Sequence, residues 1–289
     1  MRTIEDTDLL LPTSLGEALE MLADESRRGV LLAGGTDLMV QWEAEVRPPP
    51  ERAISLKGLP EELRGIDEQA EAIVIGSGTT HADLRCSQLV HQYAPSLAEA
   101  AATVGGAQIQ ALGTIGGNVA NASPAGDLAP SLLVADAEVV LASVRGERSV
   151  SMSGFLLGYR EIDLAADELI ARFILRKLQP GEQEGWRKLG TRAAQAISKI
   201  MGSYRGCAED GVVRSMAVAL GSVAPTAVRL TRFEEWIVGK KVDEALLDEV
   251  EQKVAGEITP IDDIRSTAEY RRWVSGRAVR GFVEQLVQG

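Results

Sequence analysis

The sequence predicts an α+β fold, in which helices and strands alternate before an antiparallel region and a final run of helices. A short apolar run at 30–33 follows a helical pattern and ends at a glycine turn, as a buried strand does. Hairpin signals at Arg145-Gly146 and Glu209-Asp210-Gly211 predict antiparallel strand pairs. Acidic amphipathic patterns predict the C-terminal helices over 231–238, 242–255 and 266–287.

The other elements follow from local signals along the chain. A capping box of Ser14 and Glu17 begins the first helix, and Thr80 is the expected cap of a helix from 82 to 90. A polar break after Pro180-Gly181 is the expected domain boundary. Helical patterns lie at 96–104 and 128–135, and strand-length apolar runs lie at 54–56, 72–75, 138–143, 169–178, 186–189, 196–204 and 212–220.

A glycine turn links the strand at 30–33 to the next helix. Gly34-Gly35 makes the turn, and Thr36 or Asp37 caps the helix. Such a turn places backbone N–H groups at a helix N-terminus, where an anion is favoured. The turn matches neither the GxGxxG pattern nor a phosphate-binding P-loop. A tight turn without a ligand is the alternative interpretation.

A second glycine-rich stretch runs from Gly113 to Asp127 and contains Gly-Thr-Ile-Gly-Gly-Asn. Its density of glycine predicts a chain folded closely against another group, with amides turned outward as an anion nest. The two stretches together indicate one extended ligand held by two loops. For Asp127, capping the helix at 128–135 is an alternative to ligand binding.

The composition excludes several classes of function. The chain has 289 residues, enough for two domains, and 30 basic against 42 acidic residues give a net charge of -12. This charge and an aromatic content of 4% argue against nucleic-acid binding. The N-terminus lacks a signal-peptide pattern and no apolar run has the length of a membrane span, so a soluble, cytoplasmic protein is expected.

Cysteine and histidine are too scarce for a metal site. Cys86 and Cys207 form no CxxC pattern and cannot hold an iron–sulfur cluster or a structural zinc, so two reduced, buried thiols are expected. His81 and His91 pair with no nucleophile or ligand pattern. For His81, a surface or capping position is favoured over a catalytic one.

The two glycine motifs, at 31–38 and 114–118 with its extension to Asp127, resemble the FAD signatures of one group of flavoproteins. These are the medium, FAD-binding subunits of molybdenum hydroxylases, which include xanthine dehydrogenase, carbon monoxide dehydrogenase, quinoline oxidoreductase and 4-hydroxybenzoyl-CoA reductase. The resemblance covers nearly the whole chain. Further matching segments lie at 146–150, 188–199, 221–226 and 269–272.

The resemblance implies a two-domain organisation. Residues 1–178 would form a two-part FAD-binding domain of the vanillyl-alcohol-oxidase (PCMH) type, with subdomains of about 1–57 and 58–178. Residues 179–289 would form the C-terminal domain of the family, an antiparallel sheet plus helices.

It also implies a set of cofactor-binding residues. Both motifs would wrap the FAD pyrophosphate, Val104 would contact the flavin, Asp127 would bind FAD hydroxyls, and Lys199 would lie near the flavin ring. A solvated surface lysine is the alternative for Lys199. Catalytic residues and metal ligands are not expected in this chain. The motif residues are Leu32, Ala33, Gly34, Gly35, Thr36, Asp37 and Leu38 in the first loop and Thr114, Gly116, Gly117 and Asn118 in the second.

The resemblance finally implies partners. Molybdopterin would lie on a large subunit and [2Fe–2S] clusters on a small one, in a dimer of heterotrimers without nucleic acid or a membrane span. Electrons would pass through FAD to NAD, oxygen, a quinone or another external acceptor. Gln110 replaces a common family arginine and removes a positive charge near the site. The alternatives are a self-contained flavin-dependent oxidase or dehydrogenase of the same superfamily and a structural subunit without FAD.

Overall fold

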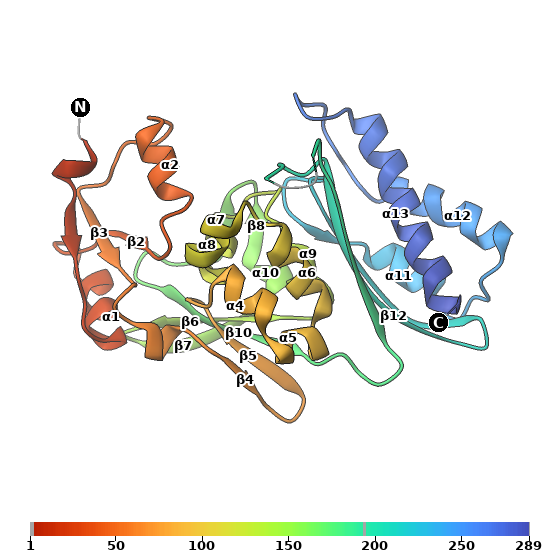
Figure 1. The fold of residues 1–289 in the computed structure, drawn as a ribbon, viewed down its shortest axis with the longest axis horizontal. Helices are drawn as coiled ribbons and strands as arrows, with labels where there is room; N and C mark the ends of the chain where they lie inside the picture. The colour runs from red at the N-terminus through yellow and green to blue at the C-terminus, as the bar shows by residue number, and fades with distance from the viewer. Residues whose placement is uncertain (1–2, 193–194, 289) are drawn as a thin grey trace.

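The computed structural model describes residues 3–192 and 195–288 and contains three main sheets along its length (Figure 1). The first is a parallel sheet in the order β1 (Asp8–Leu10), β3 (Arg52–Ser55) and β2 (Val30–Leu32). The short η1 (Ile4–Asp6) precedes this sheet. Helices α1 (Leu15–Ala23), α2 (Leu38–Glu43) and α3 (Pro60–Leu63) accompany it.

The middle sheet is antiparallel and carries most of the helices that surround the site. Its order is β4 (Ile66–Glu68), β5 (Ala72–Gly76), β10 (Leu169–Arg176), β6 (Glu138–Ser143) and β7 (Gly146–Ser151). A small pair, β8 (Leu156–Gly158) with β9 (Glu161–Ile162), follows α10 (Met152–Phe155). The helices on this sheet are α4 (His81–Cys86), α5 (Gln88–Tyr93), α6 (Pro95–Thr103), α7 (Ala107–Leu112), α8 (Ile115–Ala120) and α9 (Ala129–Val134).

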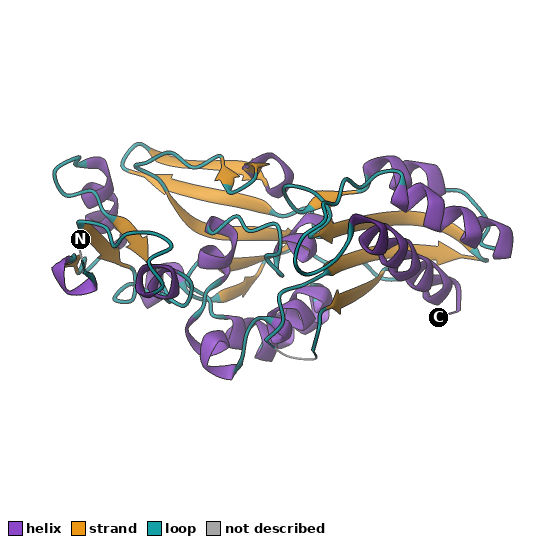
Figure 2. Ribbon diagram, turned by 90° about the horizontal axis from the view of Figure 1, so that it is seen from above, coloured by secondary structure: helices purple, strands orange, loops and turns teal. Residues whose placement is uncertain are grey.

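The third sheet is covered on both faces. Its antiparallel order is β11 (Gln183–Leu189), β12 (Ile200–Glu209), β13 (Val212–Gly221) and β14 (Val228–Arg229). The helices α11 (Thr231–Ile237), α12 (Glu244–Ala255) and α13 (Ala268–Gln288) follow in the chain. Helices α11 and α13 contact its strands, and separately α6 and α9 contact them and so tie this sheet to the middle of the molecule. Figure 2 shows the strands running along the long axis.

A buried ion pair fixes the third sheet to the helices of the middle sheet. Arg205 on β12 pairs with Glu184 on β11, and both side chains are almost fully enclosed. The Arg205 guanidinium also donates to the carbonyl of Arg176 at 3.1 Å, while Glu184 accepts the N–H of Ser96 at 3.0 Å. Each charged group thus bonds to its ionic partner and to a backbone group of the middle region. Removing either partner would leave the other as a buried charge without compensation.

Most local signals are confirmed. The hairpin signal at Asp210-Gly211 is a turn with positive φ at both residues, 52° and 74°. The Ser14 hydroxyl accepts the N–H of Glu17 as predicted. The strand expected over 196–204 begins only at Ile200.

The expectations about the two cysteines and about a membrane span can be compared with the structure. Cys86 is exposed and Cys207 half-buried, so the expectation of two buried thiols is wrong. Within the described residues, none of the helices has the length and apolar composition needed to cross a membrane.

Candidate functional site

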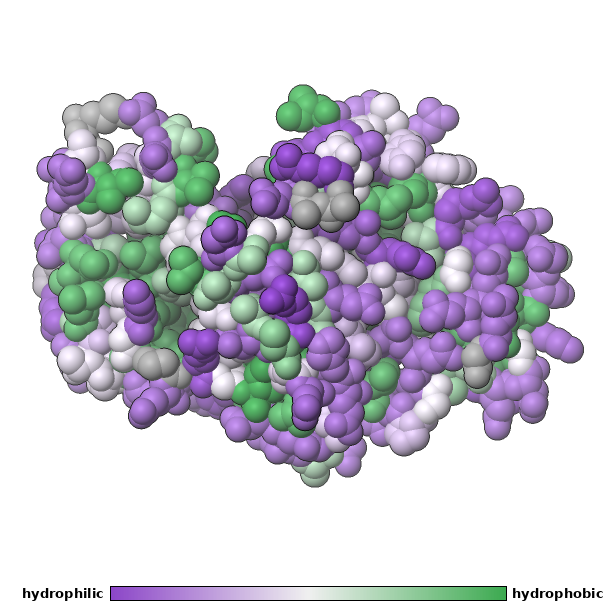
Figure 3. Space-filling model, viewed as in Figure 1, coloured by the Kyte–Doolittle hydropathy of each residue, from purple (hydrophilic) through white to green (hydrophobic). Residues whose placement is uncertain are grey.

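The two glycine loops lie in backbone contact. A side-chain carbon at Gly34 would collide with the carbonyl of Leu112, so the main chains can approach only because Gly34 has no Cβ. Figure 3 shows the surface hollowed between the lobe that carries α2 and the middle of the molecule, which carries α7 and α8. The contact therefore joins the first sheet to the helices of the middle sheet at one place.

The first loop presents free backbone N–H groups. Gly35 has a φ of +70°, which only glycine adopts readily, and it turns the chain after β2. Among residues 3–192 and 195–288, no acceptor takes the N–H of Gly34, Gly35, Thr36 or Asp37. Consecutive amides of this kind form a concave anion-binding nest. Asp37 occupies the expected cap position of α2, but its carboxylate accepts from Gln41 and not from the helix amides.

The second loop differs from the expectation of a second nest. Its N–H groups are used inside the protein: Gly116 donates to the Ser77 carbonyl at 2.8 Å and Gly117 to the Thr114 hydroxyl at 3.1 Å. The N–H of Asn118 donates to the Thr114 carbonyl at 3.0 Å. The expectation of outward-turned amides is therefore wrong for these residues, because the neighbouring segment and the helix cap have already bound them.

What the second loop offers is space and a side-chain amide. Of the described atoms, a Cβ at Gly117 would meet only the Thr114 hydroxyl, at 3.1 Å, whereas a Cβ at Gly116 would strike Ser77 at 2.7 Å. Gly116 is thus needed for packing, and Gly117 leaves room for another group to approach. The side chain of Asn118 makes no hydrogen bond within the described part of the chain.

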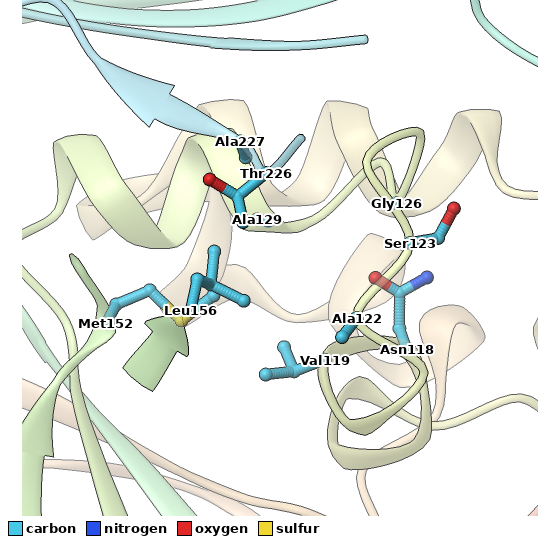
Figure 4. Close-up of a pocket in the computed structure, with 10 residues that line it drawn as sticks. All are labelled: Asn118, Val119, Ala122, Ser123, Gly126, Ala129, Met152, Leu156, Thr226 and Ala227. Atoms are coloured by element: carbon cyan, nitrogen blue, oxygen red, sulfur yellow. The ribbon is translucent and has the colours of Figure 1, made fainter. Parts of the chain in front are cut away.

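A small cavity lies directly beside the second loop, which forms part of its wall (Figure 4). Its volume of about 10 Å³ is close to that of one water molecule. It is lined by residues of the second loop and by residues from α9, α10, β8 and the turn before β14: Asn118, Val119, Ala122, Ser123, Gly126, Ala129, Met152, Leu156, Thr226 and Ala227. It has no room for a cofactor.

Asp127 connects the second loop to the third sheet. Its carboxylate accepts hydrogen bonds from the Lys188 ammonium at 2.6 Å and from the Ser198 hydroxyl at 3.0 Å. Burial raises the pKa of the Asp127 carboxyl, while Lys188 and Ser198 oppose that rise. The N-cap of α9 is Leu128, without a side-chain capping bond, so the capping alternative for Asp127 is wrong.

Lys188 is a residue that the sequence reasoning did not single out. Besides pairing with Asp127, its ammonium donates to the carbonyl of Thr103 at 3.0 Å. The Lys188 ammonium therefore lies at the C-terminal end of α6, where Thr103 precedes Val104 in the chain. Its only sequence signal was its place at the start of the matching segment 188–199. Ala193 and Ala194 of that segment lie outside the described residues.

Lys199 lies elsewhere. Its ammonium sits 5.1 Å from the centre of the Tyr270 ring on α13, a cation–π contact, and its side chain is half-buried. Lys188 and not Lys199 is the partner of Asp127. A cavity of about 190 Å³ adjoins Lys188 and is lined by Thr103, Trp186, Arg187, Lys188, Gly190, Arg192, Gln195 and Ala196.

Gln110 has a structural role that accounts for its burial. Its side-chain amide donates to the carbonyls of Ala102 at 2.9 Å and Val104 at 3.1 Å, which are left open at the end of α6. A neutral amide therefore ties down the backbone at Val104. Its own carbonyl oxygen is enclosed and has no partner among the residues that the structure describes.

A third segment, between β5 and α4, completes the site. Residues 77–81 run beside residues 113–116. The Ile115 N–H donates a hydrogen bond to the Thr79 carbonyl at 3.0 Å, and the His81 N–H donates to the Gly113 carbonyl at 3.0 Å. The cap of α4 is Thr80, as expected. His81 is only 3% exposed, so the expectation of a surface or capping histidine is wrong.

These features give the protein a row of free backbone amides in the first loop and a buried acid–lysine pair at the end of the second, an arrangement suited to an extended, anionic ligand. No group of three or more His, Cys, Asp or Glu side chains suited to a metal ion exists among the described residues. Residues 5–176 match the family described as FAD binding domain in molybdopterin dehydrogenase, and residues 187–286 match the CO dehydrogenase flavoprotein C-terminal domain.

Individual relatives agree with these matches. The chain is 30% identical to the carbon monoxide dehydrogenase medium chain of Hydrogenophaga pseudoflava, covering 93% of each protein. It is 30% identical to a xanthine dehydrogenase FAD-binding subunit of Escherichia coli O157:H7, covering 89% of this chain and 88% of the relative. The structure of the Hydrogenophaga enzyme superposes with a TM-score of 0.89 at 29% identity, covering 95% of each chain. Reconstituted CO dehydrogenase from Oligotropha carboxidovorans gives 0.91 at 26% identity and 98% coverage of each chain.

The chain therefore belongs to the FAD-binding medium subunits of the molybdenum hydroxylases, which are oxidoreductases. The predicted family, the α+β fold and FAD as cofactor are thereby confirmed.

Proposed function

We propose that this chain is the electron-relay subunit of a molybdenum hydroxylase. When bound, FAD would supply the redox chemistry of this relay, between the [2Fe–2S] clusters of a partner subunit and an external acceptor. The observation that carries the proposal is the row of free amides from Gly34 to Asp37, placed in contact with the second loop. Such amides bind a diphosphate without positive side chains, which suits a protein with a net charge of -12.

The two loops divide the binding between them. In the first loop, amides of the nest bind the diphosphate, and the neighbouring Leu32, Ala33 and Leu38 shape its walls. In the second, Thr114 caps α8 and Gly116 packs on Ser77, so that the open face of Gly117 and the side chain of Asn118 meet the cofactor.

Asp127 and the end of α6 bind the flavin half. An ionised Asp127 has lone pairs beyond those used by Lys188 and Ser198, and these accept hydrogen bonds from cofactor hydroxyls. Val104, braced by Gln110, contacts the flavin ring. Lys188 adds a positive charge at this end, and the position of Lys199 on Tyr270 places a second cation near the third sheet.

The partners are proposed from the relatives. Several are named as medium chains or FAD subunits of larger enzymes, so we propose a large molybdopterin subunit and a small [2Fe–2S] subunit, assembled as a dimer of heterotrimers. The division into domains 1–178 and 179–289 and a cytoplasmic location belong to the same proposal. The acceptor is NAD, oxygen, a quinone or another oxidant.

An absorption spectrum of the purified chain tests the cofactor part of the proposal. Bands near ~450 nm that persist through gel filtration are expected for bound oxidised flavin. A folded chain that takes up no FAD would favour the structural-subunit alternative. Reduction of the flavin by an organic substrate without partners would favour the self-contained oxidase.

A further inference from the structure

The ring of His81 lies between the two cofactor loops. A Cβ added at Gly113 in the second loop would be 3.0 Å from the His81 Cδ2 and 3.1 Å from the Thr36 hydroxyl of the first loop. Both side chains therefore approach the same small region beside Gly113. The position is fixed by the backbone, because the His81 N–H is held by the Gly113 carbonyl at 3.0 Å.

The His81 imidazole has no hydrogen-bond partner in the described structure. Its Nδ1 is fully enclosed and unpaired, and no ring nitrogen bonds to another described residue. Nε2 also has no partner among the described residues, but unlike Nδ1 it is not fully enclosed, so it is the ring nitrogen left open to a ligand. Burial lowers the pKa of His81 to about 4, so the ring is neutral near pH 7 and carries one N–H.

Because Nδ1 of His81 is enclosed, only Nε2 can form a hydrogen bond with a ligand. A cofactor atom cannot reach a nitrogen surrounded by protein, whereas Nε2 is bonded to Cδ2, the ring atom that lies beside Gly113 as the Thr36 hydroxyl does. A neutral ring with its proton on Nε2 is a donor at that edge. Thr36 is one of the residues whose amide is free. A donor at this point therefore faces an anion in the nest.

We propose that His81 is a diphosphate-binding residue, whose Nε2–H donates to a phosphate oxygen of FAD held by the first loop. This inference rests on the proposed function, because the nest must hold the diphosphate. It makes the segment 77–81 a third part of the cofactor site, in addition to the two glycine loops. The alternative is a purely steric role, in which the ring only keeps the loops at their spacing.

Substitutions that separate the two roles are available at this position. In His81→Gln the terminal amide reaches about as far as Nε2, whereas in His81→Asn it replaces Nδ1; His81→Phe keeps a ring without a donor. His91→Phe is the matched control, because His91 is exposed and its Nε2 lies 2.7 Å from the Arg85 carbonyl. Each full-length variant is stripped of flavin and titrated with FAD and with ADP, which has the diphosphate but no flavin, and its melting temperature is recorded.

We expect His81→Phe and His81→Asn to weaken FAD and ADP binding by similar factors of about 10 to 100. His81→Gln and His91→Phe should stay within about threefold of the parent. The inference is overturned if His81→Phe binds both ligands like the parent, if it loses FAD but keeps ADP affinity, or if His81→Gln is as weak as His81→Phe. Should His81→Phe not fold, the contrast between Gln and Asn decides. A parent chain that binds no FAD would contradict the proposed function itself and not this assignment alone.

Discussion

Asp127 and Lys188 form a buried ion pair, 2.6 Å between carboxylate and ammonium, that joins the second glycine loop to the first strand of the third sheet. The pair joins two parts of the chain that match separate family models, residues 5–176 and residues 187–286. In the proposed site the same carboxylate also accepts bonds from the cofactor. Binding of FAD and attachment of the third sheet are therefore expected to depend on one side chain.

A double-mutant cycle separates these two roles. Asp127→Ala and Lys188→Met should each lower the free energy of unfolding by about 3 kcal/mol, because each leaves a buried charge unpaired. The double variant should recover part of that loss. FAD affinity should fall by about 1–3 kcal/mol in both variants that lack Asp127, and less in Lys188→Met. Denaturant unfolding and flavin titration measure the two quantities. Unchanged FAD affinity in Asp127→Ala would mean that the carboxylate does not bind the cofactor and only joins the second loop to the third sheet.

Gly117→Ala tests the approach of the cofactor without a large change in folding. The structure leaves space at this position apart from the Thr114 hydroxyl at 3.1 Å, and alanine is a better helix former than glycine. We expect unfolding free energy within about 1 kcal/mol of the parent and FAD affinity lowered at least about tenfold. Gly281→Ala in α13, where a Cβ has no neighbour within 4 Å, is the matched control and should leave FAD affinity unchanged. Parent-like FAD binding by Gly117→Ala is the contrary result.

The burial of His81 predicts a pH dependence of stability. The folded chain takes up a proton at His81 only near pH 4, whereas the unfolded chain does so near 6.5, so acidification favours unfolding across this interval. The loss from this group approaches about 1.4 kcal/mol per pH unit. Flavin-free parent and His81→Phe should therefore differ in slope between about pH 6.5 and 4, with the parent losing more stability. Equal slopes would mean that the folded ring titrates as it does in water.

The sequence was informative where structure is decided locally. The turn at Asp210-Gly211, the Ser14 cap and the turn at Gly34-Gly35 depend on neighbouring residues, and each was predicted. The motif residues of both loops could also be named from the sequence, and their binding roles stay predictions.

Long-range contacts were not predictable in the same way. Lys188 reaches Asp127 across 61 positions, and nothing local marks it. The amides of the second loop were expected to be free, but the segment at 77–81 binds two of them. His81 was expected at the surface or as a cap. Its burial could not be predicted, because it depends on packing against Gly113, which lies in the distant second loop.

The most direct test of the relay function compares flavin reduction in the chain alone and in the complex with its co-purifying subunits. Both preparations are mixed anaerobically with candidate aromatic, purine and aldehyde substrates while the absorbance near ~450 nm is followed. The account predicts that the flavin bleaches only in the complex, and that the chemically reduced lone chain still passes electrons to an added acceptor. Substrate-dependent bleaching by the lone chain would contradict it.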